Sequence, residues 1–393
     1  MTLRTIVVLV AAAACQRSQE PPRERVAPAP QTPPAKSIPG PPPASTTREP
    51  VPPLPDPLPG VRVDLTAAIG SALRAGIGDL DGDGKSEIVI VDATRMRVLD
   101  PSGRELASTA IDRGIQQLVV ADLDGDKRAE VIAGWGVTRE HMETKAAFSV
   151  HRLEGKTLVE ESILAPTTSR QDVVAIVPMP DARSVLLAYF DAKYTVTSVI
   201  AKRAQTWETT TVASLRTATS YARGDVDGDG APDLVVGRVY GDDKGVDGDA
   251  FLLRPDGART SIPSTRGLRA IAVIGSEVVM ADGWHQNYGQ FARGLLTRAR
   301  FANGTFTTEL IEDTAGQTSI EKIAPAMLGG QPAIVTLGSS YVRVFRRDGA
   351  TWRGLTIAGA ARDIAVGDLD GVAGDEILVI GDKAETIQLS AAK

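Results

Sequence analysis

A nine-residue acidic pattern that occurs four times constrains the fold of this chain more than any other feature of its sequence. Acidic residues stand at its first, third and ninth positions, and in three copies also at the fifth. The copies begin at Asp79, Asp122, Asp225 and Asp368, and a short apolar run precedes and follows each. Short apolar runs bounded by turn residues are typical of buried strands. The pattern therefore predicts four loops, each of which joins two β-strands.

The spacing of the acids suits a metal ion. Carboxylates at loop positions one, three and five converge when the backbone turns tightly, and Ca²⁺ takes six to eight oxygen ligands. Glycine at position six, present as Gly84 and Gly230, permits the positive φ of such a turn. In helix–loop–helix calcium sites the closing acid is at position twelve and a helix follows, whereas here it is at position nine and a strand follows. The pattern predicts calcium loops in a β-structure; solvated acidic turns are the alternative.

The four segments resemble the FG-GAP and VCBS repeats, and their loops are similar to the calcium loops of the integrin alpha-subunit propeller. The resemblance implies side-chain ligands at positions one, three, five and nine and a backbone carbonyl at position seven. By position, these residues are Asp79, Asp81, Asp83, Lys85 and Glu87; Asp122, Asp124, Asp126, Arg128 and Glu130; Asp225, Asp227, Asp229, Ala231 and Asp233; and Asp368, Asp370 and Glu376. Lys127 replaces the glycine at position six of the second loop, and Val372 replaces the acid at position five of the fourth. We therefore expect about three Ca²⁺ sites and a fourth, degenerate one.

The spacing of the copies gives the number of repeats. The first two copies lie one repeat of 43 residues apart, and strand-like segments without the acids fill the wider gaps. Seven units result, which start near residues 72, 115, 171, 218, 267, 319 and 361. Repeats of about 40–50 residues with four short strands are typical of propeller blades. We predict an all-β, seven-bladed β-propeller at residues 61–393, with six blades as the alternative, and we expect residues 61–67 to complete the last blade.

The chain before residue 61 has a different composition. Residues 1–14 have a positively charged start, an apolar centre and four alanines, the layout of a secretory signal peptide. Cys15, the only cysteine, follows directly, and the segment resembles a bacterial lipoprotein signal, in which that cysteine takes lipid. Residues 15–60 hold most of the 25 prolines, so we expect a disordered, extended linker. These features predict an extracytoplasmic, lipid-anchored protein of the cell envelope; ordinary cleavage beside an incidental cysteine is the alternative.

Three of the predicted connections between second and third strands are long and carry aromatic and charged residues. Because the acidic loops join first and second strands, we expect these connections on the opposite rim. Rigid aromatic rings beside polar groups suit recognition of a protein or glycan. The candidate ligand-binding residues are Trp135, His141, Tyr240, Asp243, Asp282, Trp284, His285 and Tyr288. The alternative is that the tryptophans pack between blades, because large aromatic residues are usually buried.

The sequence favours binding over catalysis. It has no Gly-x-Ser-x-Gly elbow, no His-Glu-x-x-His and no phosphate-binding glycine loop. The net charge of −6 and the lack of a basic run argue against nucleic acid as a partner. We therefore expect a monomeric, non-enzymatic, calcium-stabilised propeller that binds a protein or carbohydrate. A propeller-based polysaccharide lyase or hydrolase is the alternative, with His285 near Asp282 as an acid or base.

Overall fold

The computed structural model describes residues 61–68 and 72–391, apart from short gaps. The gaps are 137–144, 168–169, 180–182, 192–194, 205, 240–248, 255, 265–267, 283–293, 315–317, 373 and 382–383. The described residues form 28 β-strands and no helix, hence none long and apolar enough to cross a membrane. The signal peptide at 1–14, the lipidation of Cys15 and the disordered linker at 15–60 lie outside the described residues and stay predictions.

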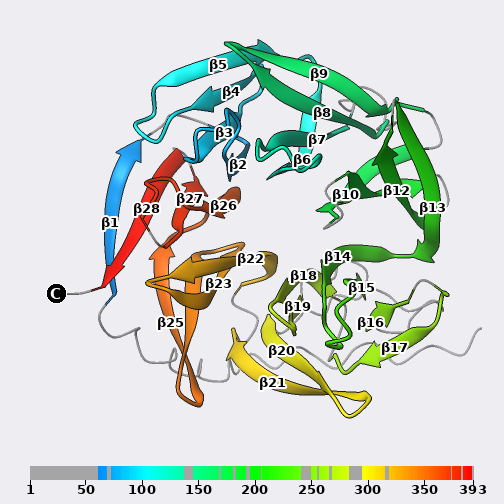
Figure 1. Ribbon diagram of the computed structural model, residues 1–393. Helices are drawn as coiled ribbons and strands as arrows, with labels where there is room; N and C mark the ends of the chain where they lie inside the picture. Colours follow the sequence, from blue (N-terminus) through cyan, green and yellow to red (C-terminus); the bar gives the residue numbers. More distant parts are fainter. Residues whose placement is uncertain are drawn as a thin grey trace, which may run out of the picture. The chain divides into compact units, whose positions relative to one another are not determined.

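The strands form seven four-stranded antiparallel sheets, the blades of a β-propeller (Figure 1). Blade 1 consists of β2 (Arg74–Gly78), β3 (Glu87–Val91), β4 (Arg95–Leu99) and β5 (Glu105–Ala110). Blade 2 consists of β6 (Gly114–Ala121), β7 (Glu130–Gly136), β8 (Ala147–Glu154) and β9 (Thr157–Leu164). Blade 3 consists of β10 (Arg170–Pro178), β11 (Ser184–Asp191), β12 (Thr195–Arg203) and β13 (Trp207–Arg216).

The remaining four blades have the same order of strands. Blade 4 consists of β14 (Ala218–Gly224), β15 (Asp233–Arg238), β16 (Ala250–Leu253) and β17 (Arg259–Ile262). Blade 5 consists of β18 (Leu268–Ile274), β19 (Glu277–Asp282), β20 (Leu295–Ala302) and β21 (Thr305–Asp313). Blade 6 consists of β22 (Ile320–Leu328), β23 (Gln331–Gly338), β24 (Val342–Asp348) and β25 (Thr351–Ala358). Blade 7 consists of β26 (Asp363–Gly367), β27 (Glu376–Ile380), β28 (Ala384–Ala391) and β1 (Val61–Ala68).

Each blade lies radially in the ring. Figure 1 shows the first strand of every blade, from β2 to β26, around the centre and the fourth strand at the outer edge. The blades begin close to the starts that the repeat spacing predicts. The seven-bladed prediction is therefore confirmed, and the six-bladed alternative is wrong.

The two ends of the described chain share blade 7. Strand β1 pairs with β28 in an antiparallel register from Val61 opposite Ala391 to Ala68 opposite Glu385. This pairing confirms the prediction that the segment before the first unit supplies the missing strand. The outer strand of blade 7 is therefore β1, which comes from the start of the described chain and pairs with β28 from its end. Because β1 leads into blade 1, this pairing links blade 7 to blade 1.

The core is divided among the interfaces between blades. The described residues contain seven clusters of buried apolar side chains, and each one includes residues from two neighbouring blades. Strand β3 is buried along its whole length, because blades 7 and 2 cover its two faces. Full burial of one such aliphatic side chain contributes about 1.5–3 kcal/mol. None of these clusters lies within a single blade, so the blades depend on one another for stability.

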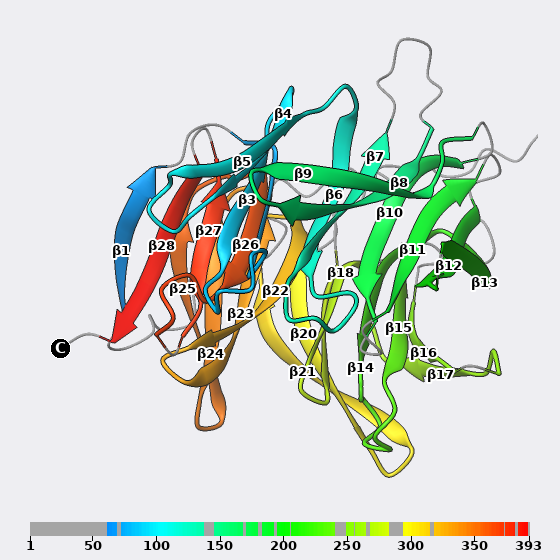
Figure 2. The same ribbon diagram turned by 45° about the horizontal axis from the view of Figure 1, so that its top comes forward.

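Antiparallel neighbours place successive connections on alternate rims of the ring (Figure 2). The connections between first and second strands, which include the four acidic loops, therefore lie on one rim. Loops of neighbouring blades touch there, since the N–H of Ala129 in the second loop donates to the carbonyl oxygen of Asp79 in the first. We call this side the loop rim.

Candidate functional site

The four acidic loops share one internal hydrogen-bond pattern. In the first loop, Asp79 accepts the N–H of Gly82 at Oδ1 (2.7 Å) and the N–H of Gly84 at Oδ2 (2.9 Å). The acid at position nine, Glu87, accepts the N–H of Leu80 at 2.7 Å. Bonds from position four to position one and from position two to position nine recur in the other three loops. Two acids of each loop therefore hold its backbone in place.

An apolar residue at position two anchors each loop to the ring. Leu80, Leu123, Val226 and Leu369 are at most 4% exposed. Leu80 packs in the cluster between blades 1 and 2, and Leu369 packs in the cluster between blades 7 and 1. The position of each loop is thus fixed by the same apolar packing that joins the blades.

Glycine at position four is the conformational requirement that all four loops share. Gly82 has a φ of 79°, and its equivalents in the other loops have φ values of 73° to 78°. Position six is left-handed as well, with a φ of 86° at Gly84 and 72° at Lys127. Lys127 therefore adopts a conformation that costs a non-glycine residue about 1 kcal/mol. The sequence reasoning used position six and missed position four, although glycine occupies it in every copy.

Each loop brings three carboxylates together. In the first loop, Asp79, Asp81 and Glu87 each place an oxygen atom within 4.8 Å of the others. The equivalent groups are Asp122, Asp124 and Glu130; Asp225, Asp227 and Asp229; and Asp368, Asp370 and Glu376. Oxygen ligands lie about 2.3–2.6 Å from Ca²⁺, so two of them are at most about 5 Å apart. Donor type and spacing therefore fit a Ca²⁺ ion.

The position-five aspartates are used differently in different loops. Asp83 and Asp126 lie outside the groups of three, and so does Asp233 at position nine of the third loop. In the third loop the position-five acid, Asp229, takes the place of Asp233 in the group. In each of the first three loops the position-five aspartate also accepts the N–H of position seven at 2.8 Å. The predicted carbonyl ligands at position seven, Lys85, Arg128 and Ala231, stay predictions. In the fourth loop, Val372 does not prevent the acids from gathering, because they stand at positions one, three and nine.

Burial leaves the first loop with a carboxylate that is costly to ionise. Glu87 is 3% exposed, and desolvation raises its pKa to about 7 despite the hydrogen bond from Leu80. The negative charges of Asp81 and Asp79 raise the pKa further. Burial also raises the pKa of Glu376, with Asp370 and Asp368 adding to the effect. A divalent cation would offset both the desolvation and the repulsion.

The loops differ in the arginines around them. Arg152, on β8, pairs with Glu130 (Nε to Oε1, 3.0 Å) and approaches Asp124 of the second loop (Nη2 to Oδ2, 3.9 Å). Arg254 pairs with Asp227 of the third loop at 2.9 Å. Among the described residues, no cationic side chain is within 4.0 Å of the three grouped acids of the first loop. Both arginines lie more than twenty residues along the chain from the acids they contact, so the loop motif does not reveal them.

Trp135 corrects one sequence prediction. Its side chain is fully buried rather than exposed on the opposite rim, because β7 extends through Gly136 and Trp135 packs between blades 1 and 2. Its Nε1 donates to Ser149 Oγ at 2.6 Å, and that oxygen lies 3.0 Å from His151 Nε2. Trp135 is thus a core residue, and the inter-blade alternative is correct for it. The apolar alternation of Val131, Ala133 and Trp135 on one face of β7 is the signal that indicates this.

Of the other candidate ligand-binding residues, the structure describes one. Asp282 is 2% exposed at the end of β19, and its carboxylate accepts the backbone N–H of Leu295. The other six, His141, Tyr240, Asp243, Trp284, His285 and Tyr288, lie outside the described residues.

Comparisons with known proteins agree with this architecture. Residues 79–133 match the model of the FG-GAP-like repeat family, a span that contains the first two acidic loops. A crystal structure of BBS1N in complex with ARL6DN, soaked with lead, is similar with a TM-score of 0.56 at 13% identity, covering 86% of this chain and 96% of that one. A second such crystal, soaked with mercury, has a TM-score of 0.54 at 13% identity, covering 84% and 96%. No curated protein sequence matches the chain.

The fold and the loops together define the class of protein. It is a seven-bladed β-propeller with repeated acidic loops on one rim. Within this fold, residues 79–133, which contain the first two acidic loops, match the FG-GAP-like repeat family.

Proposed function

We propose that this protein is a non-enzymatic, calcium-stabilised propeller that presents a binding surface to a protein partner at the cell envelope. The observation that carries the proposal is the group of Asp79, Asp81 and Glu87, in which a buried acid lies beside two further acids without a cation among the described residues. These residues would hold the ion in the first loop. The bound ion supplies positive charge that removes the repulsion and joins the loop to the start of β3.

A protein partner is supported by the solved structures with this fold. In both of them BBS1N is in complex with ARL6DN. The acidic loops occupy one rim, so we assign the partner surface to the opposite rim, where the long connections after β7, β15 and β19 start. Trp284 and His285 are the side chains that we expect to contact the partner.

Binding rather than catalysis is supported by the described histidine. His151 and Ser149 form a hydrogen-bonded pair of nucleophile and base types, but both are 1% exposed between blades. A substrate cannot reach a pair that is sealed in the core. The pair therefore serves packing and satisfies the indole N–H of Trp135.

Removal of calcium tests the proposal. When free Ca²⁺ is at ten times the Kd of a site, its binding adds about 1.4 kcal/mol to the free energy of unfolding. Three such sites add about 4 kcal/mol. Urea unfolding in Ca²⁺ and in EGTA measures this difference, and an equal free energy in both would overturn the proposal. Asp81→Asn should remove one increment in Ca²⁺ and leave the EGTA value unchanged. Asp112→Asn is the control, because Asp112 is exposed and lies outside the acidic loops.

The envelope location has its own test. Cys15→Ser should move the protein from the membrane fraction to the soluble fraction and abolish the incorporation of labelled fatty acid. A variant that still fractionates with membranes would show that the sequence around Cys15 has been misinterpreted.

A further inference from the structure

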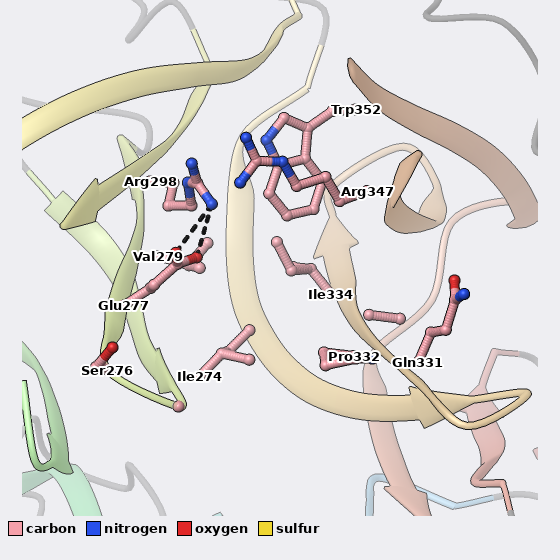
Figure 3. Close-up of a pocket in the computed structure, with 12 residues that line it drawn as sticks. Ile274, Ser276, Glu277, Val279, Arg298, Gln331, Pro332, Ile334, Arg347 and Trp352 are labelled. Carbon is pink, nitrogen blue, oxygen red and sulfur yellow. Dashed lines mark hydrogen bonds and ion pairs between the residues drawn. The ribbon is translucent and has the colours of Figure 1, made fainter. Parts of the chain in front are cut away.

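The loop rim is open between blades 5 and 6. There the first and second strands are joined by two-residue turns, since Ile274 pairs with Glu277 and Leu328 pairs with Gln331. In blade 1, by contrast, the strands end at the pair of Gly78 with Glu87, with the whole acidic loop between them. The short turns leave a cleft of about 490 Å³ between the two blades (Figure 3). This volume suits a small molecule or a few residues of a peptide.

One wall of the cleft carries a cation without a partner. Arg347 on β24 and Trp352 on β25 are cross-strand neighbours, and Figure 3 shows the guanidinium beside the indole. Among the described residues, no carboxylate forms an ion pair with Arg347, and no acceptor binds its Nε or the Nε1 of Trp352. A half-buried guanidinium without an anion bears a desolvation cost that a bound carboxylate would repay.

The opposite wall holds a second arginine that is already neutralised. Arg298 donates from Nη1 to both carboxylate oxygens of Glu277, at 3.0 and 2.9 Å, and also pairs with Glu309. Arg300 pairs with Glu277 as well. These pairs and Arg347 together contain three cations and two anions, so the cleft carries one uncompensated positive charge.

Apart from Ser276 and Gln331, the remaining side chains that line the cleft are apolar and firmly held. Ile334 and Val279 are 2% and 1% exposed and are fixed in the core between blades 5 and 6. Ile274 and Pro332 line the cleft beside them, and the guanidinium of Arg298 lies 5.7 Å from the Trp352 ring centroid, which holds the indole in place. Apolar walls with one free cation select a ligand that has both an apolar body and a negative charge.

We propose that this cleft binds a carboxylate on an apolar body, with the carboxylate at Arg347 and the apolar part against Ile274, Pro332 and Ile334. Such a carboxylate belongs either to a free small acid or to the carboxyl terminus of a peptide. The site goes beyond the proposed function, because it lies on the loop rim and uses none of the acidic loops.

Calorimetric titration tests this site with four probes: N-acetyl-leucine, its amide, and a tetrapeptide ending in leucine with a free or an amidated carboxyl terminus. We expect the acids to bind at least about tenfold more tightly than the amides, because a charge-assisted hydrogen bond is lost. Tighter binding of the free tetrapeptide than of N-acetyl-leucine identifies a peptide terminus, and equal binding identifies a small acid. Equal affinity for acids and amides, or no binding of either acid at millimolar concentration, overturns the proposal.

Two arginine variants locate the site. Arg347→Gln should weaken the binding of the acids at least about tenfold and leave the amides unchanged. Arg346→Gln is the matched control, since its neighbour in the β24–β25 pair is Arg353, and Arg346 does not line the cleft. Both variants should keep the melting temperature of the wild type, which excludes misfolding. Equal losses in the two variants would refute the assignment to Arg347.

Discussion

The interface between blades 1 and 2 and the interface between blades 5 and 6 have similar apolar cores but different loops on the loop rim. Between blades 1 and 2, long acidic loops touch, and Arg128 of the second loop reaches the carbonyl oxygens of Leu80 (3.3 Å) and Leu153 (3.0 Å). Between blades 5 and 6, two-residue turns leave a cleft on the loop rim, and the ion pair of Arg343 with Glu312 joins the blades nearer the opposite rim. The apolar clusters behind both arrangements are alike. The loops can therefore vary from blade to blade, because an apolar cluster packs at each of these interfaces whatever the loops above it contain.

The largest expected effect breaks the ion pair between blades 5 and 6. Arg343 and Glu312 are 1% and 5% exposed, and burial lowers the pKa of Arg343 to about 10. Glu312→Gln leaves a buried charge without its partner, so we expect a loss of about 3–5 kcal/mol in urea unfolding. The loss should be the same in Ca²⁺ and in EGTA. Glu309→Gln, at the partly exposed end of the Arg298 pair, is the control and should cost less than about 1 kcal/mol.

Low pH should destabilise the interface between blades 1 and 2, because His151 is buried there. Burial lowers the pKa of His151 from 6.5 to about 4, so the unfolded chain binds a proton at a pH where the folded protein does not. The contribution of His151 to the free energy of unfolding is complete above pH 6.5. It falls by about 3 kcal/mol as the pH drops to 4. His151→Asn should remove this part of the pH dependence. Parallel stability–pH curves for the variant and the wild type would contradict the pKa shift.

The arginine beside the second loop should weaken its affinity for calcium. Arg152 occupies carboxylate oxygens of Glu130 and lies near Asp124, both members of the second acidic group. Arg152→Gln should therefore raise the Ca²⁺ affinity of one site by about tenfold, as one competing charge pair is removed. Calcium titration by calorimetry measures this change. Arg104→Gln, whose partner Asp100 lies outside the loops, should leave the affinities unchanged.

The smallest effect concerns the strained residue of the second loop. Lys127→Gly should stabilise the protein by about 0.5–1 kcal/mol, because glycine adopts the φ of 72° without strain. Lys156→Gly is the control at a turn position that is not left-handed, and it should destabilise slightly or not at all. A loss of stability on Lys127→Gly would mean that the lysine side chain contributes more than its backbone conformation costs.

The fold could be predicted almost completely from the sequence, whereas the surroundings of the site could not. Repeat spacing indicates seven blades because every blade repeats one strand–loop–strand unit, and the shared blade follows from counting strands. The contacts of Arg152 and Arg254 with the loops depend on side chains that the repeat does not specify. Trp135 was misplaced because the glycines on either side resemble a turn, although they continue β7. The cleft between blades 5 and 6 exists because two-residue turns stand where other blades have acidic loops. The absence of a motif gives no signal in the sequence.

The sharing of blade 7 also sets the order in which the protein can be completed. Among the described strands, β1 is synthesised first and its partner β28 last. Until β28 is made, β1 has no partner and blade 7 cannot be completed, so a translation product that ends before β28 carries an unpaired strand. The edge of such a strand is a substrate for chaperones and proteases. The edge is hidden only when β28 pairs with β1, so a complete ring distinguishes a full-length propeller from a shortened one.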